Sequence, residues 1–318
     1  MDLYDLSREI KTFLRQDRRD VGDLIHKERA SLVLVDGLGW NIAKDLKASV
    51  APMKISSVFP TITVTVFATL LTAKRPGEHG ILGWRLLDRE EGRIVNLLES
   101  LKEEPLELET FFEGTDSLFV MPEAATRGLM AKLRVVPYYT YWDGLYKYRR
   151  ALEEGHKFVF FYIPYVDATS HVHGPFHEAT LTAAREIVTA LDRVATSFRE
   201  SYTVLITADH GHVALERNFD LWEDREFMEE MEFPPYGDSR NLMIKGKLPK
   251  SLAKYGTVYE RGKVVELVGG TKNVPDFLLV PHDNTNVVYW KDEMEHLHRG
   301  GHGGMTRDEM EVPLYVYE

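Results

Sequence analysis

The sequence contains no cysteine among its 318 residues. This absence excludes disulfides, thiolate zinc sites, iron–sulfur clusters and a cysteine nucleophile. It is also compatible with a reducing compartment such as the cytosol, where disulfides rarely form. We therefore expect a cytoplasmic protein.

A long apolar segment is also missing. The longest apolar run, FVFFYIPYV from Phe158, falls far short of the ~20 residues that span a bilayer. The N-terminal stretch MDLYDLSREIKTFLRQDRRD is charged throughout and lacks the apolar core of a signal peptide. We expect no membrane partner.

Basic residues are in deficit, with 39 Lys and Arg against 50 Asp and Glu, for a formal net charge of -11. Such an acidic chain is a poor binder of nucleic-acid backbones, so we expect no nucleic-acid polymer as partner. A small phosphorylated substrate, such as a nucleotide, is compatible with this charge because bound metal ions reverse the local sign.

Buried strands alternate with helices along the chain. The apolar patterns predict strands at 31–35, 157–167 and 202–212 and helices at 1–29, 63–74, 141–154 and 177–200. This alternation predicts an α/β fold, a three-layer sandwich with a mostly parallel central sheet. Residues 216–300 differ, with prolines, glycines, charge clusters and hairpin-like pieces. We interpret them as an inserted cap within a single catalytic domain over 1–318.

Each of the three buried strands ends on an aspartate, and histidines accompany them. The aspartates are Asp36, Asp167 and Asp209, and the histidines are His171, His210 and, in the segment GGHGG, His302. In open α/β sheets, ligands bind beyond the carboxyl ends of the strands. Three carboxylates at one sheet edge would repel one another strongly without a cation. Asp and His without Cys favour zinc or another divalent transition ion over calcium or magnesium.

Three Asp and three His residues are enough for two metal sites. Two ions about 3.5–4 Å apart are a standard arrangement for displacement at phosphorus. A nucleophile is also required, and VFPTITVTVF offers the hydroxyls of Thr61, Thr63 and Thr65 near a predicted helix start. Free N–H groups and the helix dipole favour an incoming phosphate there. Position alone leaves Thr61 and Thr63 open.

Five separated motifs give the chain a resemblance to a known family. They are LVDGLGW, FPTITVTVFATLLTAKRPGEHGILG, PYVDATSHVHGP, TADHGH and GGHGG, between residue 32 and about residue 304. With these motifs the chain resembles the alkaline phosphatase superfamily and, within it, the nucleotide pyrophosphatase/phosphodiesterase (type I phosphodiesterase) family.

The resemblance implies roles for these residues. One zinc ion would be bound by Asp36, Asp209 and His210 together with Thr63, and a second by Asp167, His171 and His302. Mn²⁺, Fe²⁺ or Co²⁺ could occupy the same ligands. The family's Tyr/Phe-Pro-Thr-x-Thr motif makes Thr63 the expected nucleophile, acting through a phospho-threonine intermediate. The histidines His173, His177 and His212 are candidates either for orienting the ligands or for solvated loops.

Two departures from the family pattern affect substrate recognition. Trp84 stands where the family usually has an asparagine that donates to a phosphate oxygen, and Val64 stands where an aromatic residue often follows the nucleophile. Trp84 could stack a base or narrow the pocket, and Arg85 could supply the missing donor. A phosphodiesterase or nucleotide pyrophosphatase is the leading hypothesis. A phosphonate hydrolase or phosphomonoesterase is the alternative, and a non-catalytic metal- or nucleotide-binding sensor is a hypothesis of another class.

Overall fold

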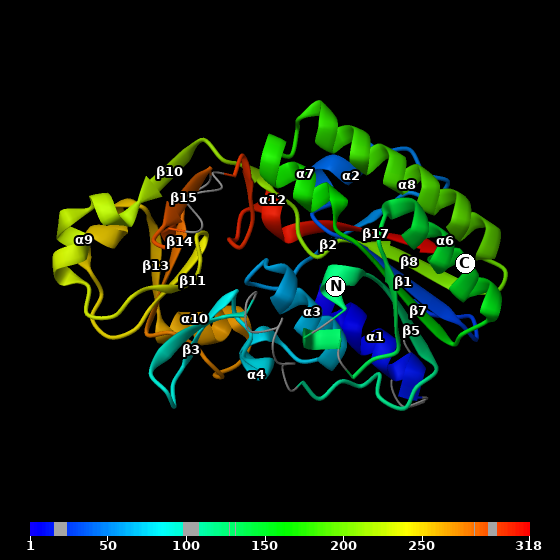
Figure 1. Cartoon of the computed structure of the whole chain (residues 1–318), viewed down its shortest axis with the longest axis horizontal. Coiled ribbons are helices and arrows are strands. Elements are labelled where there is room, and N and C mark those ends of the chain that lie inside the picture. The colour runs from blue at the N-terminus through cyan, green and yellow to red at the C-terminus, as the bar shows by residue number, and fades with distance from the viewer. Residues whose placement is uncertain (16–23, 98–107, 127, 131, 283, 292–297) are drawn as a thin grey trace.

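Two sheets form the framework of the protein. The computed structural model describes residues 1–318 except 16–23, 98–107, 127, 131, 283 and 292–297. A larger sheet with its helices lies beside a smaller, mostly antiparallel sheet, and the two are drawn at the right and the left of Figure 1.

The larger sheet has the order β2-β17-β8-β1-β7-β5-β6. Its strands β8, β1, β7, β5 and β6 run parallel, while β17 is antiparallel to both β8 and β2. The mostly parallel sheet predicted from the sequence is thus confirmed. Its strands are β1 (Ala30–Val35), β2 (Met53–Ser56), β5 (Ser117–Pro122), β6 (Val135–Tyr138), β7 (Phe158–Ile163), β8 (Thr203–Thr207) and β17 (Glu311–Tyr317).

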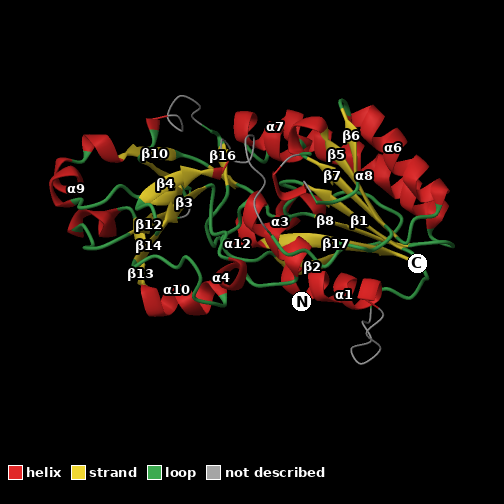
Figure 2. Cartoon of the chain, turned by 60° about the horizontal axis from the view of Figure 1, so that its bottom comes forward, coloured by secondary structure: helices red, strands yellow, loops and turns green. Residues whose placement is uncertain are grey.

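Helices cover both faces of this sheet and complete three layers. One face carries α1 and α3, and the other carries α2, α6, α7 and α8 (Figures 1 and 2). Because both faces are covered, the central strands are apolar throughout instead of alternating. The helices are α1 (Leu3–Arg15), α2 (Trp40–Ala43), α3 (Thr63–Thr72), α4 (Pro76–His79), α6 (Tyr141–Glu154), α7 (Tyr165–His173) and α8 (Glu178–Phe198).

Three predicted elements are longer than the observed ones. The strand predicted over 202–212 ends at Thr207, and residues 208–212 are not part of it. The helix predicted over 1–29 ends at Arg15, and residues 24–29 are not helical because their backbone N–H groups at 26 and 27 donate to the Thr203 hydroxyl, both at 3.3 Å. Part of that prediction, 16–23, lies outside the described residues. The strand predicted over 157–167 ends at Ile163, and Pro164 then precedes α7. The apolar run across this boundary concealed the change from strand to helix.

The smaller sheet has the order β13-β14-β12-β11-β3-β4. It combines residues from 236–281 with the hairpin of β3 and β4, so it is not built from residues 216–300 alone. Beside it, β10 (Arg217–Asp220) and β15 (Thr285–Val288) form a parallel pair. The six strands are β3 (Arg85–Asp88), β4 (Arg93–Asn96), β11 (Tyr236–Asp238), β12 (Asn241–Ile244), β13 (Gly256–Glu260) and β14 (Phe277–Pro281).

Short helices lie against this second unit, and two short segments lead back to the larger sheet. The helices are α9 (Arg225–Glu230), α10 (Arg261–Val268) and the 3₁₀ turns Leu221–Glu223 and Lys250–Lys254. The returning chain forms β16 (Gly300–Gly301), which pairs with β9 (Val213–Ala214), and then α12 (Arg307–Met310) before β17. That 216–300 acts as a substrate-selecting cap stays a prediction.

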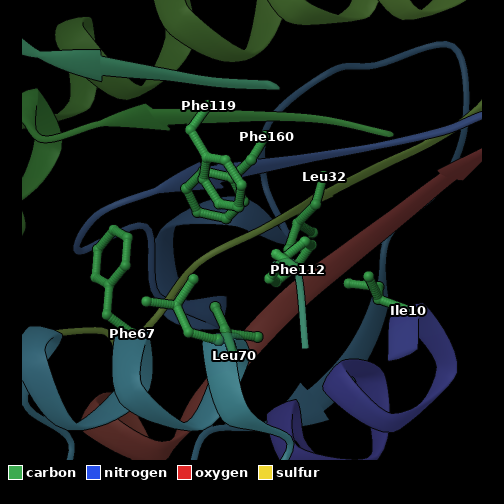
Figure 3. A pocket seen from close by; sticks show the side chains of 8 residues that line it. Ile10, Leu32, Phe67, Leu70, Phe112, Phe119 and Phe160 are labelled. Atoms are coloured by element: carbon green, nitrogen blue, oxygen red, sulfur yellow. The ribbon is translucent and has the colours of Figure 1, made fainter. Parts of the chain in front are cut away.

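Aromatic contacts beside a narrow apolar gap hold α3 against the central sheet. Phe67 of α3 packs edge-on against Phe160 and Tyr162 of β7, with ring centroids 5.8 and 4.9 Å apart. The gap offers no polar group to a ligand and belongs to the core (Figure 3). Its lining consists of Ile10, Leu32, Phe67, Leu70, Leu71, Phe112, Phe119 and Phe160.

In the part of the chain that the structure describes, no helix has both the length and the apolarity needed to cross a bilayer.

The aromatic contacts of Phe67 lead to a prediction about stability. Replacing Phe67 by Ala removes a buried ring from the contact between α3 and the central sheet and leaves a cavity, so we expect a loss of about 3–5 kcal/mol in the free energy of unfolding. Urea unfolding followed by circular dichroism measures it. The control is Tyr146→Ala on α6, where the side chain is 64% exposed and the change should stay within about 0.5 kcal/mol. Equal losses in the two variants would contradict this account.

Candidate active site

Three aspartates meet at the carboxyl ends of the adjacent strands β8, β1 and β7. Asp36 directly follows β1, and Asp209 lies two residues beyond β8. The sequence suggested that Asp167 ends β7, but this residue lies in the first turn of α7. Backbone hydrogen bonds join the strand ends, since the Asp36 N–H donates to Ile163 at 2.9 Å and the Asp167 N–H donates to Asp36 at 2.9 Å.

Gly37 lets these segments approach so closely. It has a φ of +74°, and a Cβ there would lie 2.7 Å from the Cα of Asp167. Its N–H also donates to Asp209 Oδ1 at 3.1 Å. The glycine after Asp36 is therefore required by the contact between β1 and α7 as well as by its backbone conformation.

Asp36, Asp209 and His210 form the first candidate metal group. His210 Nε2 lies 3.4 Å from Asp36 Oδ1 and 3.4 Å from Asp209 Oδ2. All three side chains are buried, and neither of these two oxygens has a hydrogen-bond partner in the structure. Buried carboxylate oxygens without a partner are costly, and a divalent cation would satisfy them. This donor set fits zinc or a similar transition ion.

Burial sets the protonation of this group. Burial, together with the charges of Asp209 and Asp167, raises the pKa of Asp36 well above its usual range. Burial likewise raises the pKa of Asp209 to about 6. Burial lowers the pKa of His210 to about 4, so its imidazole is neutral at pH 7. Tyr162 donates a hydrogen bond to Asp36 Oδ2 and partly offsets the first of these shifts.

Thr63 lies at the edge of this first group. It is the first residue of α3, as predicted, and its Oγ1 lies 3.3 Å from His210 Nε2. The Thr61 hydroxyl is instead bonded to the loop after His302. It donates to the Gly304 carbonyl at 2.9 Å and accepts from the Gly303 N–H at 2.9 Å. Of these two threonines, Thr63 has the hydroxyl beside the candidate metal ligands.

Asp167, His171 and His302 come together as a second group. His171 Nε2 lies 3.2 Å from Asp167 Oδ1 and 3.2 Å from His302 Nε2, and His302 Nε2 lies 3.6 Å from the same carboxylate oxygen. The other ring nitrogens face backbone carbonyls, with His171 Nδ1 3.0 Å from Gly300 and His302 Nδ1 2.8 Å from Thr61. With a proton on each Nδ1, the Nε2 lone pairs can bind a metal ion once His171 has lost the Nε2 proton that it donates to Asp167.

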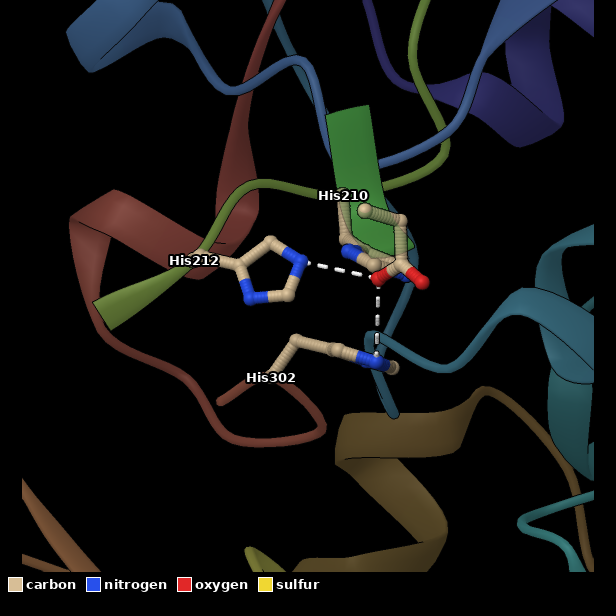
Figure 4. Close-up of side chains that lie close together, drawn as sticks. His210, His212 and His302 are labelled. Carbon is tan, nitrogen blue, oxygen red and sulfur yellow. Dashed lines mark hydrogen bonds and ion pairs between the residues drawn. The ribbon is translucent and has the colours of Figure 1, made fainter. Parts of the chain in front are cut away.

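His212 joins this second group and was not among the predicted ligands. Its buried Nε2 lies 2.8 Å from Asp167 Oδ1, and Figure 4 shows its ring beside those of His210 and His302. The alternation of histidines in DHGH was the only signal for it. His173 and His177, in contrast, are exposed and stack on each other with ring centroids 4.8 Å apart.

The charges of the second group favour an ionised carboxylate. Burial alone would raise the pKa of Asp167, but the charge of His171 and hydrogen bonds from His171 and His212 hold it well below its usual range. Burial lowers the pKa of His302 to about 4. The His210 and His302 rings stack with centroids 3.7 Å apart, which places the two candidate groups side by side.

The two predicted substrate-binding residues lie in different surroundings. Trp84 is partly buried and packs against an apolar cluster that includes Ile62 and Val64, the residues on either side of Thr63. Arg85 is buried in β3, with its guanidinium 5.1 Å from the centre of the Trp290 ring. A role in substrate binding stays a prediction for both residues.

Comparisons with known proteins agree with this arrangement. The family model for type I phosphodiesterase / nucleotide pyrophosphatase matches residues 32–305. A search of curated proteins found no match. Several solved structures share the fold at 17% identity, each covering 91% of this chain.

Two of these structures are ectonucleotide pyrophosphatase/phosphodiesterase 5 from mouse, an inactive variant in complex with AMP, and the same protein from human. Their TM-scores are 0.73 and 0.72, and 87% of each chain is covered. A third is phosphonoacetate hydrolase from Sinorhizobium meliloti 1021 in complex with phosphonoformate, with a TM-score of 0.65 and 90% of its chain covered.

The raised pKa of Asp209 predicts proton release when a cation binds. In the cation-free protein, Asp209 is largely protonated below about pH 6, and it must lose that proton to become a ligand. Zn²⁺ titration by calorimetry, in buffers of different ionisation enthalpy, should therefore show more protons released and weaker binding at about pH 5.5 than at about pH 7.5. In Asp209→Asn fewer protons should be released at about pH 5.5, and the proton from Asp36, whose pKa is also raised, should remain. A proton count that is the same at both pH values in the wild type would contradict the assignment.

Proposed function

Because the chain belongs to the type I phosphodiesterase/nucleotide pyrophosphatase family, whose members are metal-dependent hydrolases of phosphate esters, we propose that it cleaves a phosphodiester or pyrophosphate bond of a small nucleotide-like substrate. The observation that carries this proposal is the position of Thr63. Its hydroxyl lies at the start of α3, beside His210 and two buried carboxylates whose oxygens lack partners.

Two divalent ions, most simply Zn²⁺, would be held by the two groups of ligands. Asp36, Asp209, His210 and Thr63 would hold one, and Asp167, His171 and His302 the other, with His212 supporting Asp167. When bound, such ions lower the pKa of a hydroxyl group and offset the negative charge of the phosphate. Mn²⁺, Fe²⁺ or Co²⁺ would suit the same ligands.

The start of α3 provides the binding site for the phosphate. No side chain caps this helix, so the first backbone N–H groups have no partner within it. These groups and the positive end of the helix dipole attract an anion beside Thr63. The phosphate would then lie between the helix start and the two groups of metal ligands.

The reaction then proceeds by double displacement at phosphorus. Thr63 Oγ1 forms a bond to phosphorus as the bond to the leaving oxygen breaks, and the hydroxyl proton passes to solvent. The product of this step is a phosphorylated Thr63. Water attacks the same phosphorus, releases the phosphate monoester and restores the hydroxyl of Thr63.

A phosphonate hydrolase is the second candidate. One structural neighbour is a phosphonoacetate hydrolase, and Trp84 replaces the asparagine that is usual in the family, so the group bound beside the phosphorus could differ. A phosphomonoesterase would also fit this altered pocket. A non-catalytic sensor would bind nucleotide and metal without turnover.

Removing the hydroxyl of Thr63 tests the nucleophile. We expect Thr63→Ala to retain its metal ions but to lose activity about 10³-fold or more, and Thr63→Ser to recover part of it because the hydroxyl returns. Zinc-loaded protein is assayed with bis(p-nitrophenyl) phosphate and p-nitrophenyl phosphate, with metal content measured alongside.

Thr65→Val is the matched control for this experiment. Thr65 lies two residues further along the same helix, and its buried hydroxyl has no hydrogen-bond partner, so the isosteric change should leave kcat near the wild-type value. Near-normal turnover of Thr63→Ala would refute the nucleophile. Preference for the monoester, or for phosphonoacetate, would change the substrate class, and zinc binding without cleavage of any of them would favour the sensor.

Trp84 is tested with two substrates that share a leaving group. If a nucleobase stacks on Trp84, Trp84→Ala should raise KM about 10-fold for the p-nitrophenyl ester of a nucleoside 5′-phosphate and leave methyl p-nitrophenyl phosphate nearly unchanged. Trp84→Phe keeps an aromatic face and should behave like the wild type. An equal rise in KM for both substrates would show that Trp84 only shapes the pocket wall.

A further inference from the structure

A buried ion pair joins the smaller sheet to the loop that carries His302. Arg240, 1% exposed, lies in the turn between β11 and β12, and Glu309, 0% exposed, lies in α12 just before β17. Arg240 donates from Nε to Oε1 at 2.6 Å and from Nη2 to Oε2 at 2.9 Å. Two parallel hydrogen bonds of this kind fix both the distance and the orientation of the partners.

The carboxylate of Glu309 also holds the segment that follows His302. Its Oε1 accepts from the Gly304 N–H at 2.8 Å. Its Oε2 accepts from the Thr306 N–H at 3.1 Å and from the Thr306 hydroxyl at 2.8 Å. A single carboxylate therefore ties the hairpin of the smaller sheet to the chain on the C-terminal side of His302.

The segment 300–304 has almost no side chains of its own with which to hold its shape. Its four glycines surround His302, and Cβ atoms built on Gly301 and Gly304 would meet this ion pair. At Gly301 a Cβ would lie 3.1 Å from Arg240 Cδ, and at Gly304 it would lie 2.8 Å from Glu309 Oε2. Glycine loses more conformational freedom on ordering than any other residue, so the neighbours of this loop must define its path.

The pair is charged at neutral pH. Burial alone would raise the pKa of Glu309, but the charge of Arg240 and the hydrogen bonds from Arg240, Thr306 and Gly304 hold it below its usual range. Removing one partner would leave the other as a buried, unpaired charge, which is strongly destabilising. The loop and the hairpin thus share one buried electrostatic contact.

We propose that the Arg240–Glu309 pair is a positioning device for His302, and through it for the metal site of Asp167, His171 and His302. This inference rests on the two-metal site of the proposed function. Because Arg240 belongs to the β11–β12 hairpin, that site is complete only when the smaller sheet is docked. The site of Asp36, Asp209 and His210 contains no residue of the 300–304 loop. Glu309 contacts the chain beside it through its backbone carbonyl, which accepts from the Gly211 N–H at 3.0 Å and is kept when the side chain is changed. This site therefore does not depend on the side-chain ion pair.

The test measures Zn²⁺ affinity at each site separately. Protein freed of metal is titrated with Zn²⁺ against a chromophoric chelator in two backgrounds, His302→Ala and Asp36→Asn, each of which disables one site. We expect Glu309→Gln to weaken Zn²⁺ binding about 10–100-fold in the Asp36→Asn background. In the His302→Ala background the change should be less than about threefold, because the remaining ligands do not lie on this loop.

Two further variants separate positioning from stability. Arg240→Met with Glu309→Leu removes both charges and should restore much of the thermal stability, yet the site of Asp167 should stay weak because the loop has lost its acceptor. Asp224→Asn is the matched control. Its buried carboxylate accepts from Lys254 and Tyr255 in the smaller sheet unit, so the variant should lose stability while both Zn²⁺ affinities stay unchanged.

Equal Zn²⁺ affinity of the wild type and Glu309→Gln in the Asp36→Asn background would overturn the positioning role. So would equal weakening in the two backgrounds, or recovery of Zn²⁺ affinity together with stability in the double variant. A different result, in which the wild-type protein binds fewer than two Zn²⁺ ions, would overturn the two-metal site itself, and this inference with it.

Discussion

The repulsion among three buried carboxylates is the constraint on which the site depends. The adjacency of β8, β1 and β7 brings together Asp36, Asp167 and Asp209, and burial strengthens the repulsion between their negative charges. The protein places histidine rings, with His171 favouring its charged form, and, in the proposed function, divalent cations among these oxygens. Gly37 lets the strand ends approach, and Tyr162 donates a hydrogen bond to Asp36, whose pKa is raised by burial and by the charges of the other two aspartates.

Backbone carbonyls determine what the histidines can do. The carbonyls of Gly300 and Thr61 face the Nδ1 atoms of His171 and His302, so both rings present Nε2 toward Asp167. The Thr61 carbonyl therefore orients the ring of His302, while Thr63, two residues later, places its hydroxyl beside His210 at the start of α3. One short segment thus provides both the support for a histidine and the candidate nucleophile.

Local patterns predicted what depends on local structure. The buried strands, the helix at Tyr141–Glu154 and the helix that begins at Thr63 all follow from apolar periodicity, and the common sheet edge follows from parallel strands. The boundary at Pro164 was missed because the apolar run continues across it. Contacts between residues that are far apart in the sequence produce no local sequence pattern. The sequence separation is 45 residues for His212 and Asp167, 69 for Glu309 and Arg240, and 126 for Tyr162 and Asp36. The place of β3 and β4 in the smaller sheet was hidden for the same reason.

The position of β17 has a consequence for biosynthesis. This strand follows every other element in the chain order, yet it lies between β2 and β8 inside the larger sheet. Until β17 has been synthesised and has paired, β2 and one edge of β8 lack their partner in the sheet and are open to association with other chains. Glu309 lies directly before β17, so its contact with the chain after His302 also forms late in synthesis. The group of Asp167, His171 and His302 can therefore assemble only after the N-terminal parts of both sheets have been made.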